Sequence, residues 1–206
     1  MRALYRWLFP DYEKELKRAC VGSVKLLDIG CGDNSPIQSF SKNLYSVGFD
    51  AFAPSIEASK NKGIHSAYLE GVVKDLPLHF GVASFDTVLA SDLIEHLTKE
   101  EGIKLIATME RIATKKVIIF TPVGFLPQAG VKNNPFQEHK SGWSVEDFKK
   151  QGYDVIGING LRCLRGEFAG IRWKPKWFWI IISDITQLWT RNRPKYAFQQ
   201  LAIKEK

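Results

Sequence analysis

The sequence predicts an α/β protein built on a doubly wound, mostly parallel sheet with helices on both faces. Short β-branched or apolar runs alternate along the chain with stretches long enough for helices, which is typical of βαβ units. The length of 206 residues, with 25% charged and 45% hydrophobic side chains, is that of a single soluble globular domain. A glycine-rich turn follows the first apolar run, at the end of a strand where open parallel sheets bind ligands.

Seven apolar, β-branched or aromatic runs are expected to form the strands. In chain order they are 24–28, 45–50, 66–70, 85–90, 116–121, 153–158 and 196–203. The last run follows a long insertion, so the runs alone leave its direction open. A carboxylate stands at or just after the end of three of these predicted strands: Asp28, Asp50 and Asp92. Ligands lie outside the carboxyl ends of parallel strands, so these acids are the first candidate site residues.

The intervening stretches are expected to be helices. They cover 11–19, 35–44, 54–62, 92–113, 144–151 and 175–189. Pro175 fits a first helical turn, where its missing N–H costs nothing. Ser144 with Asp147 has the spacing of a helix N-terminus, with Ser144 as the cap.

We expect one domain over 1–206, with an N-terminal helix in 1–20 and a basic, Trp-rich insertion on the substrate side at about 161–194. Cys20, Cys31 and Cys163 are odd in number and scattered, which fits neither a disulfide framework nor a paired-cysteine zinc site. A reducing cytoplasm is the expected compartment, with peripheral membrane contact as an extension. No run reaches the ~18 apolar residues of a membrane span.

The net charge of +7 is placed unevenly. Residues 1–131 carry 15 basic and 15 acidic groups, whereas residues 132–206 carry 14 basic and 7 acidic groups. Four of the six tryptophans lie within the insertion, in the same C-terminal part. The C-terminal third is therefore expected to meet something different from the ligand of the first strands.

The glycine-rich turn, Asp28-Ile-Gly30-Cys-Gly32-Asp33, lets a nucleotide approach the backbone closely. Asp28 and Asp33 flank the glycines, and two carboxylates repel a diphosphate. They suit an ammonium, ribose hydroxyls or a sulfonium, which are the groups of S-adenosylmethionine. Asp50, 22 residues after Asp28, is placed to accept hydrogen bonds from ribose hydroxyls.

With these residues the chain resembles class I S-adenosylmethionine-dependent methyltransferases of the small-molecule branch called type 11. The resemblance rests on Leu26–Gly32, Gly48–Asp50, Leu76-Pro77, Ser84–Leu97 and Val117–Pro122. It implies a Rossmann-like sheet of seven strands, with the last strand antiparallel, and S-adenosylmethionine as the cofactor.

The resemblance also implies the cofactor residues, which are Asp28, Gly30, Cys31, Gly32, Asp50, Ala51, Val73, Asp75 and Ser91. The glycines and Asp28 would face the methionine part, Asp50 the ribose and Ala51 the adenine. The family usually has an acid and a small residue before Leu-Pro, whereas this chain has Val72-Val73. Asp75 or the backbone of Val73 would contact the adenine instead.

Three interpretations are open for Asp92, Glu95 and His96. In the first Asp92 caps a helix and Glu95 reaches back to it, which makes a capping box. In the second His96 is a general base or orients the acceptor, and His139 from a later Gly/Pro-rich loop also reaches it. In the third Asp92, Glu95 and His96, with His139 as a further donor, hold a divalent metal. The main expectation has His96 and His139 as catalytic residues and no metal.

Trp143 is open to two interpretations, contact with the acceptor or packing under its loop. Three interpretations are open for the insertion: a cap over the acceptor, a membrane-surface contact through 173–193, or a nucleic-acid contact. The nucleic-acid contact is not expected. The main functional hypothesis is transfer of a methyl group to a small or lipid-like acceptor, with O-methylation favoured. The alternatives are an RNA methyltransferase and a non-catalytic, cofactor-binding or membrane-associated protein. The oligomeric state is not predicted.

Overall fold

The computed structural model describes residues 11–130 and 134–206. Seven strands form one sheet: β1 (Lys25–Ile29), β2 (Tyr45–Asp50), β3 (Ala67–Glu70), β4 (Phe85–Ser91), β5 (Ala113–Pro122), β6 (Asp154–Leu161) and β7 (Ala197–Glu205). Their order is β3-β2-β1-β4-β5-β7-β6. β7 pairs antiparallel with both β5 and β6, and the other neighbours are parallel. The predicted doubly wound sheet, with its last strand reversed, is confirmed.

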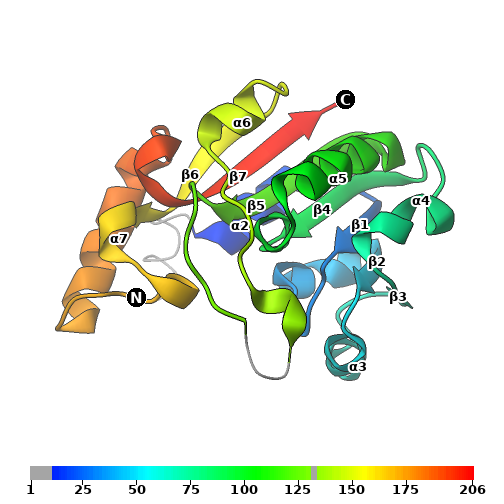
Figure 1. Cartoon of the computed structure of the whole chain (residues 1–206), viewed down its shortest axis with the longest axis horizontal. Coiled ribbons are helices and arrows are strands. Elements are labelled where there is room, and N and C mark those ends of the chain that lie inside the picture. The colour runs from blue at the N-terminus through cyan, green and yellow to red at the C-terminus, as the bar shows by residue number, and fades with distance from the viewer. Residues whose placement is uncertain (1–10, 131–133) are drawn as a thin grey trace.

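Six helices of the described chain accompany the sheet (Figure 1). They are α2 (Tyr12–Ala19), α3 (Ala53–Lys62), α4 (Leu76–His79), α5 (Lys99–Ile112), α6 (Val145–Lys149) and α7 (Lys176–Thr190). α4, α5 and α6 contribute side chains to the core on one face of the sheet, and α2 contributes to the core on the other. The first ten residues of the expected N-terminal helix lie outside the described residues.

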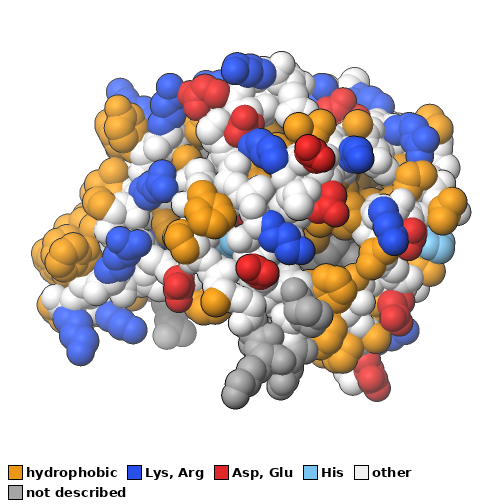
Figure 2. Space-filling model, viewed as in Figure 1, with side chains coloured by type: hydrophobic (Ala, Val, Ile, Leu, Met, Phe, Trp, Pro, Cys, Tyr) orange, Lys and Arg blue, Asp and Glu red, His pale blue; other side chains and the backbone are white. Residues whose placement is uncertain are grey.

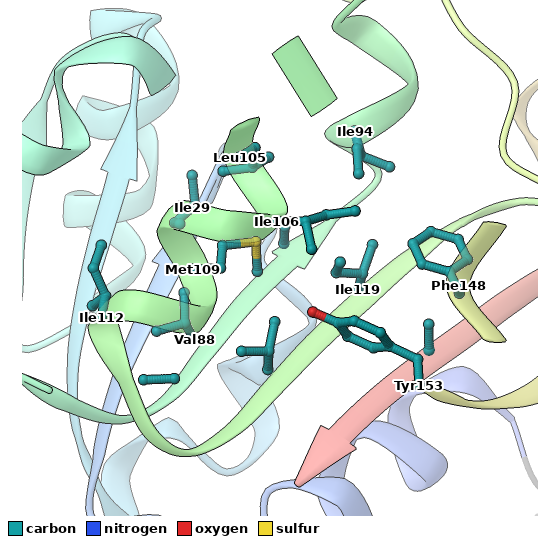
Figure 3. Packing of buried hydrophobic residues seen from close by; sticks show 14 of the residues in the cluster. Ile29, Val88, Ile94, Leu105, Ile106, Met109, Ile112, Ile119, Phe148 and Tyr153 are labelled. Carbon is teal, nitrogen blue, oxygen red and sulfur yellow. The ribbon is translucent and has the colours of Figure 1, made fainter. Parts of the chain in front are cut away.

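The hydrophobic core is split by the sheet into two layers. Neighbouring strand residues alternate between them, so that Leu27 faces one layer and Leu26 the other. Figure 3 shows the first layer, where Leu105, Ile106 and Met109 of α5 pack over the strands. This burial on both faces explains why the central strands are continuous apolar runs.

Two expected helices differ from the structure. Residues 35–44 form two short 3-10 turns, Pro36–Ser39 and Ser41–Asn43. Serine and asparagine side chains compete for backbone hydrogen bonds and favour turns over helix interiors, as the Ser35 hydroxyl does in accepting from the N–H of Ile37.

The helix expected over 92–113 begins only at Lys99, so the predicted capping box of Asp92 and Glu95 is wrong. Asp92 has a φ of 47°, which is not helical, and a 3-10 turn over Ile94–His96 comes first. The capping box is made by Thr98 and Glu101, whose side chains each accept the other's backbone N–H.

α7 covers the open edge of the sheet with its polar side. β6 pairs with β7 alone, so its other edge presents unpaired backbone groups. Gln187 accepts from the N–H of Gly160 and donates to the carbonyl of Gly157, both at 2.8 Å. Thr186 accepts from the N–H of Leu161, and Ser183 donates to the carbonyl of Asn159. Polar side chains of α7 therefore complete the hydrogen bonding of this edge strand.

The glycines of β6 allow this close packing. A Cβ on Gly157 would lie 2.2 Å from the carbonyl oxygen of Thr190, and one on Gly160 would lie 2.2 Å from that of Ser183. The buried side chains of α7 are accordingly polar: Ser183, Gln187 and Thr190. Most of its large apolar side chains are exposed, namely Trp177, Phe178, Ile180, Ile181, Ile185, Leu188 and Trp189, while Trp179 and Ile182 are half-buried. This helix is amphipathic in the reverse sense to an ordinary surface helix.

Candidate active site

The glycine-rich turn after β1 joins the ends of β1 and β2. Gly30 and Gly32 have φ values of 70° and 57°, in the left-handed region that favours glycine. The N–H of Gly30 donates to the carbonyl of Phe49 at 2.7 Å. A Cβ on Gly30 would lie 2.9 Å from Cδ1 of Leu93. The turn therefore has no room for a side chain at Gly30.

Asp50 at the end of β2 is tied to the same turn. Its Oδ2 accepts from the N–H of Gly32 and its Oδ1 accepts from the N–H of Phe52, both at 2.8 Å. Burial raises the pKa of the Asp50 carboxyl, and these two N–H donors oppose the rise. A carboxylate has about four acceptor positions, so Asp50 fixes the turn and still has lone pairs for hydroxyl groups.

Asp28 is held from two sides and is almost fully buried. The hydroxyl of Ser35 donates to its Oδ2 at 2.5 Å, and Nε2 of His65 lies 2.9 Å from the same oxygen. The side chain of Asp28 is 1% exposed and that of His65 is 0% exposed. His65 therefore holds the carboxylate of Asp28 in place. The sequence did not reveal this contact because the two residues lie 37 positions apart.

Two adjoining cavities open at the carboxyl ends of the strands. The larger, about 610 Å³, has in its lining Gly30, Gly32, Asp50, Ala51 and Val73. The smaller, about 420 Å³, has in its lining Asp28, Cys31, Ser91, Glu95 and His139. Both are lined by Gly30, Gly32, Asp92, His96 and Gln137, so they lie side by side. Each volume is in the range of a small-molecule site.

The structure thus brings all but one of the expected cofactor residues to this space. Asp75 lines neither cavity; it ends the 3-10 turn Val73–Asp75, just before α4. Val72, Val73 and Pro77 line the larger cavity at this point. Apolar side chains therefore take the place where the family pattern has an acid.

The turn after β4 carries two carboxylates to the floor of the smaller cavity. Asp92 accepts from Nε2 of Gln199 in β7 at 3.1 Å, and Glu95 accepts from the hydroxyl of Thr121 in β5 at 3.0 Å. Glu95 is 2% exposed, whereas Asp92 is open to the cavity. Burial, together with the negative charge of Asp92, raises the pKa of the Glu95 carboxyl well above its usual range.

His96 and His139 meet beside these carboxylates, with ring centroids 4.8 Å apart. Nδ1 of His96 lies 3.0 Å from the carbonyl oxygen of Glu138, and Nδ1 of His139 lies 2.6 Å from that of Leu126. A carbonyl only accepts, so each Nδ1 carries the proton and each Nε2 of a neutral ring has a free lone pair. Burial lowers the pKa of His96, which favours its neutral form.

Trp143 lies away from the two cavities and packs under its loop. It is 1% exposed, its Nε1 donates to the hydroxyl of Ser141 at 3.0 Å, and the ammonium of Lys99 lies 3.7 Å from its ring centroid. The structure therefore supports the packing interpretation. Ser144 caps α6 and forms a capping box with Asp147, as predicted.

Residues remote in sequence complete the site. The hydroxyl of Tyr12 donates to Ser91 at 2.7 Å, and the Tyr12 ring stacks on Phe120 at 3.6 Å. Gln199 reaches the site only because β7 returns beside β5. From the 161–194 insertion, Phe168 and Ala169 line the smaller cavity, while no described residue of α7 lines either one. α7 is therefore not the cap over the acceptor that one interpretation expected.

This strand order, with a cavity over a glycine turn and a strand-end acid, places the site where open α/β sheets bind their ligands. The model of the family described as methyltransferase domain matches residues 27–121. The chain is thus an S-adenosylmethionine-dependent methyltransferase whose first five strands contain this domain, and S-adenosylmethionine is its cofactor. No curated protein is similar enough in sequence to be matched.

Solved structures of methyltransferases have the same fold. An S-adenosylmethionine-dependent methyltransferase from Archaeoglobus fulgidus is 16% identical, with a TM-score of 0.60, over 100% of this chain and 99% of that one. One from Aquifex aeolicus is 15% identical, with a TM-score of 0.56, over 96% and 92%. Magnesium protoporphyrin IX methyltransferase from Synechocystis PCC 6803, with bound S-adenosylmethionine, is 15% identical, with a TM-score of 0.52, over 98% and 77%.

Proposed function

We propose that this enzyme transfers the methyl group of S-adenosylmethionine to a hydroxyl oxygen of a small or lipid-like molecule. The observation that carries the proposal is that the two cavities lie side by side and share Gly30, Gly32, Asp92 and His96 in their linings. The cofactor occupies the larger cavity and reaches into the smaller one with its sulfonium, and the acceptor enters the smaller cavity. An in-line displacement needs this alignment above all.

The cofactor is held in sections along the strand ends. The methionine part lies against Gly30, Cys31 and Gly32, with Asp28 and Ser91 beneath it. Asp50 accepts from the ribose hydroxyls, and Ala51 lies beside the adenine. The adenine amino group is recognised by the backbone at Val73, with Asp75 as the nearest acid in sequence. Carboxylates around this space favour a cationic sulfonium over its neutral product.

The acceptor hydroxyl is placed by the two histidines of the smaller cavity. His96 and His139 each have a backbone carbonyl at Nδ1, so the free Nε2 lone pairs hold the acceptor oxygen, directly or through a bound ion. In the transfer the oxygen forms a bond to the methyl carbon while the carbon–sulfur bond breaks, and its electron pair stays on sulfur. The hydroxyl proton has to leave, which is why a base or a Lewis acid helps at this position.

The outward face of α7 supports a lipid-like acceptor taken from a membrane surface. Figure 2 shows hydrophobic side chains gathered on the side where Figure 1 places α7, with Lys and Arg around them. Trp177 is 67% exposed, and Lys174, Lys176, Arg191 and Arg193 flank the helix in sequence. An apolar face with tryptophans and a basic rim fits an anionic bilayer surface, at about 1 kcal/mol for each basic residue that reaches it. No described helix is both long and apolar enough to cross a bilayer.

We place this surface contact on the cytoplasmic side of the membrane. Cys20, Cys31 and Cys163 are all unpaired in the structure, which suits a reducing compartment.

Cofactor binding is tested by thermal denaturation with S-adenosylmethionine, S-adenosylhomocysteine or NAD. The first two should raise the melting temperature and NAD should not. Asp50→Ala should abolish the shift, while Glu57→Ala, which removes an exposed acid from α3, should retain it. Stabilisation by NAD alone would contradict the cofactor assignment. Transfer of a labelled methyl group into fractionated extract then identifies the acceptor.

The membrane contact is tested by flotation with vesicles of anionic or neutral lipid. The protein should float with anionic vesicles, and Trp177→Ser with Ile181→Ser should abolish flotation. Leu78→Ser is the matched control because Leu78 is 82% exposed and far from α7 in the chain. A change in oligomeric state in the α7 variant would indicate a second copy as the occupant of this face. Binding of RNA that weakens with salt would indicate a nucleic acid.

A further inference from the structure

We propose that Glu95, His96 and His139 form a binding site for a divalent transition-metal ion in the smaller cavity. The main expectation from sequence had no metal here. One ligand atom from each of the three residues lies within 4.8 Å of the others, which is a separation that one ion can bridge. Glu95 and His96 come from the turn after β4, and His139 comes from the loop after β5. The two segments are held together because the carbonyl of Glu95 accepts from the N–H groups of Lys140 and Ser141.

The orientation of both imidazoles is the second observation. Metal-bound histidine commonly donates its other ring N–H to a carbonyl or carboxylate, which fixes the tautomer and the ring. His96 and His139 both have this arrangement, with backbone carbonyls at 3.0 and 2.6 Å from Nδ1. Each is 9% exposed. Both rings are therefore fixed by a carbonyl at Nδ1, and in the neutral form of such a ring the lone pair lies on Nε2.

The third observation is the negative charge of the two carboxylates in the smaller cavity. Asp92 and Glu95 both come from the turn after β4, and both line the smaller cavity. Within the part of the chain that the structure describes, neither forms a salt bridge with a lysine or arginine. A buried carboxylate such as that of Glu95 is costly beside a second carboxylate unless a cation is present. A divalent ion would compensate both, with Asp92 as a neighbour of the bound ion.

The donor set selects the class of ion. Two imidazole nitrogens and one carboxylate oxygen suit Mn²⁺, Fe²⁺, Co²⁺, Ni²⁺ or Zn²⁺, whereas Ca²⁺ and Mg²⁺ prefer oxygen ligands alone. Three protein ligands leave at least one coordination position open, as in catalytic metal sites. The cavity that these residues line is the one assigned to the acceptor.

A metal ion in this cavity would take part in the proposed methyl transfer, and this role of the ion rests on the proposed function. Bound to the ion, the acceptor hydroxyl loses its proton to water more readily, because the metal lowers the pKa of a bound oxygen. The resulting oxyanion attacks the methyl carbon, and the carbon–sulfur bond breaks with its electrons on sulfur. The products are a methyl ether and S-adenosylhomocysteine. Acceptors that reach the ion through oxygen are therefore preferred over amines.

The test is titration of the tag-free, metal-depleted protein with Co²⁺, whose visible absorption reports nitrogen and oxygen ligands, followed by competition with Zn²⁺. We expect one equivalent to bind. His139→Gln and His96→Gln should each weaken binding by about 100-fold or more, since even groups that only support a ligand are worth about 10–100-fold. His79→Gln is the matched control, because His79 is exposed and outside this cavity.

A thermal shift with S-adenosylmethionine, measured without metal, checks each variant for folding and for the cofactor site. A normal cofactor shift with weakened Co²⁺ binding supports the site. Unchanged Co²⁺ binding in the folded His96→Gln/His139→Gln double variant, or no Co²⁺ binding by the wild type up to millimolar concentration, overturns it. Loss of the cofactor shift in the wild type would instead overturn the proposed function, so the two failures are distinguishable.

Discussion

Nε2 of His65 lies 2.9 Å from Oδ2 of Asp28, and neither side chain has appreciable contact with solvent. The pair joins the segment after α3 to the end of β1, directly beneath the glycine-rich turn. We expect His65→Ala to lower the free energy of unfolding by about 3–5 kcal/mol, because it leaves a buried carboxylate with Ser35 as its remaining partner. Urea denaturation measures this. His79→Ala, at an exposed position, should change stability by less than about 0.5 kcal/mol. A His65→Ala protein as stable as the wild type would show that the contact is not structural.

Gly102 of α5 leaves space for the indole of Trp143. A Cβ on Gly102 would lie 2.3 Å from Cζ2 of Trp143. Gly102→Ala should therefore destabilise by about 1–3 kcal/mol through overpacking, although alanine is the better helix former by about 1 kcal/mol. Combining it with Trp143→Phe removes the clash. The double-mutant cycle should then show a favourable coupling, whereas additive effects would contradict this explanation.

Gln187 and Leu188 are neighbours on α7 with opposite environments. Gln187 is 4% exposed and bonded to β6, whereas Leu188 is 53% exposed. Gln187→Leu should cost about 2–4 kcal/mol, because it leaves the N–H of Gly160 and the carbonyl of Gly157 without their partner. Leu188→Gln should change stability by less than about 0.5 kcal/mol in water. Chemical denaturation of both variants measures the contrast, and the reverse order would mean that α7 is packed the other way round.

Thr98 is the residue that begins α5. Its hydroxyl accepts from the N–H of Glu101 at 3.3 Å, and the Glu101 carboxylate accepts from the N–H of Thr98 at 2.9 Å. Thr98→Ala should lower the stability by about 1 kcal/mol, as is usual for a lost N-cap. Lys104→Ala, on an exposed turn of the same helix, is the control. Equal effects of the two substitutions, measured by thermal denaturation, would argue against the cap at Thr98.

Much of the sheet is predictable from sequence because its strands are buried on both faces and read as apolar runs. The cofactor residues on β1 and β2 are predictable as well, since the glycines and Asp50 follow strands directly. The start of α5 is not, because two capping signals lie within ten residues and the one at Asp92 has the wrong backbone conformation. Only the three-dimensional fold decides between Asp92 and Thr98.

Most contacts between distant segments were not predicted from sequence patterns. His65 meets Asp28 because β1 and β2 are neighbours and α3 returns the chain beneath them. The meeting of His139 with Glu95 and His96 was among the interpretations that the sequence left open, and it arises because the loop after β5 folds back onto the turn after β4. The orientation of α7 was also hidden, since hydropathy alone favours burial of its apolar side. The polar stripe of Ser183, Gln187 and Thr190 at helical spacing was the available signal.

The hydrogen bonds between α7 and the backbone of β6 also limit how copies of this protein can associate. An unprotected terminal strand is a template on which another sheet can add, by domain swapping or by aggregation. Here the amides of Gly157, Gly160 and Leu161 already have acceptors within α7 and its C-terminal end. The sheet therefore ends at β6, and α7 protects it from growing into a fibre by strand addition on that side.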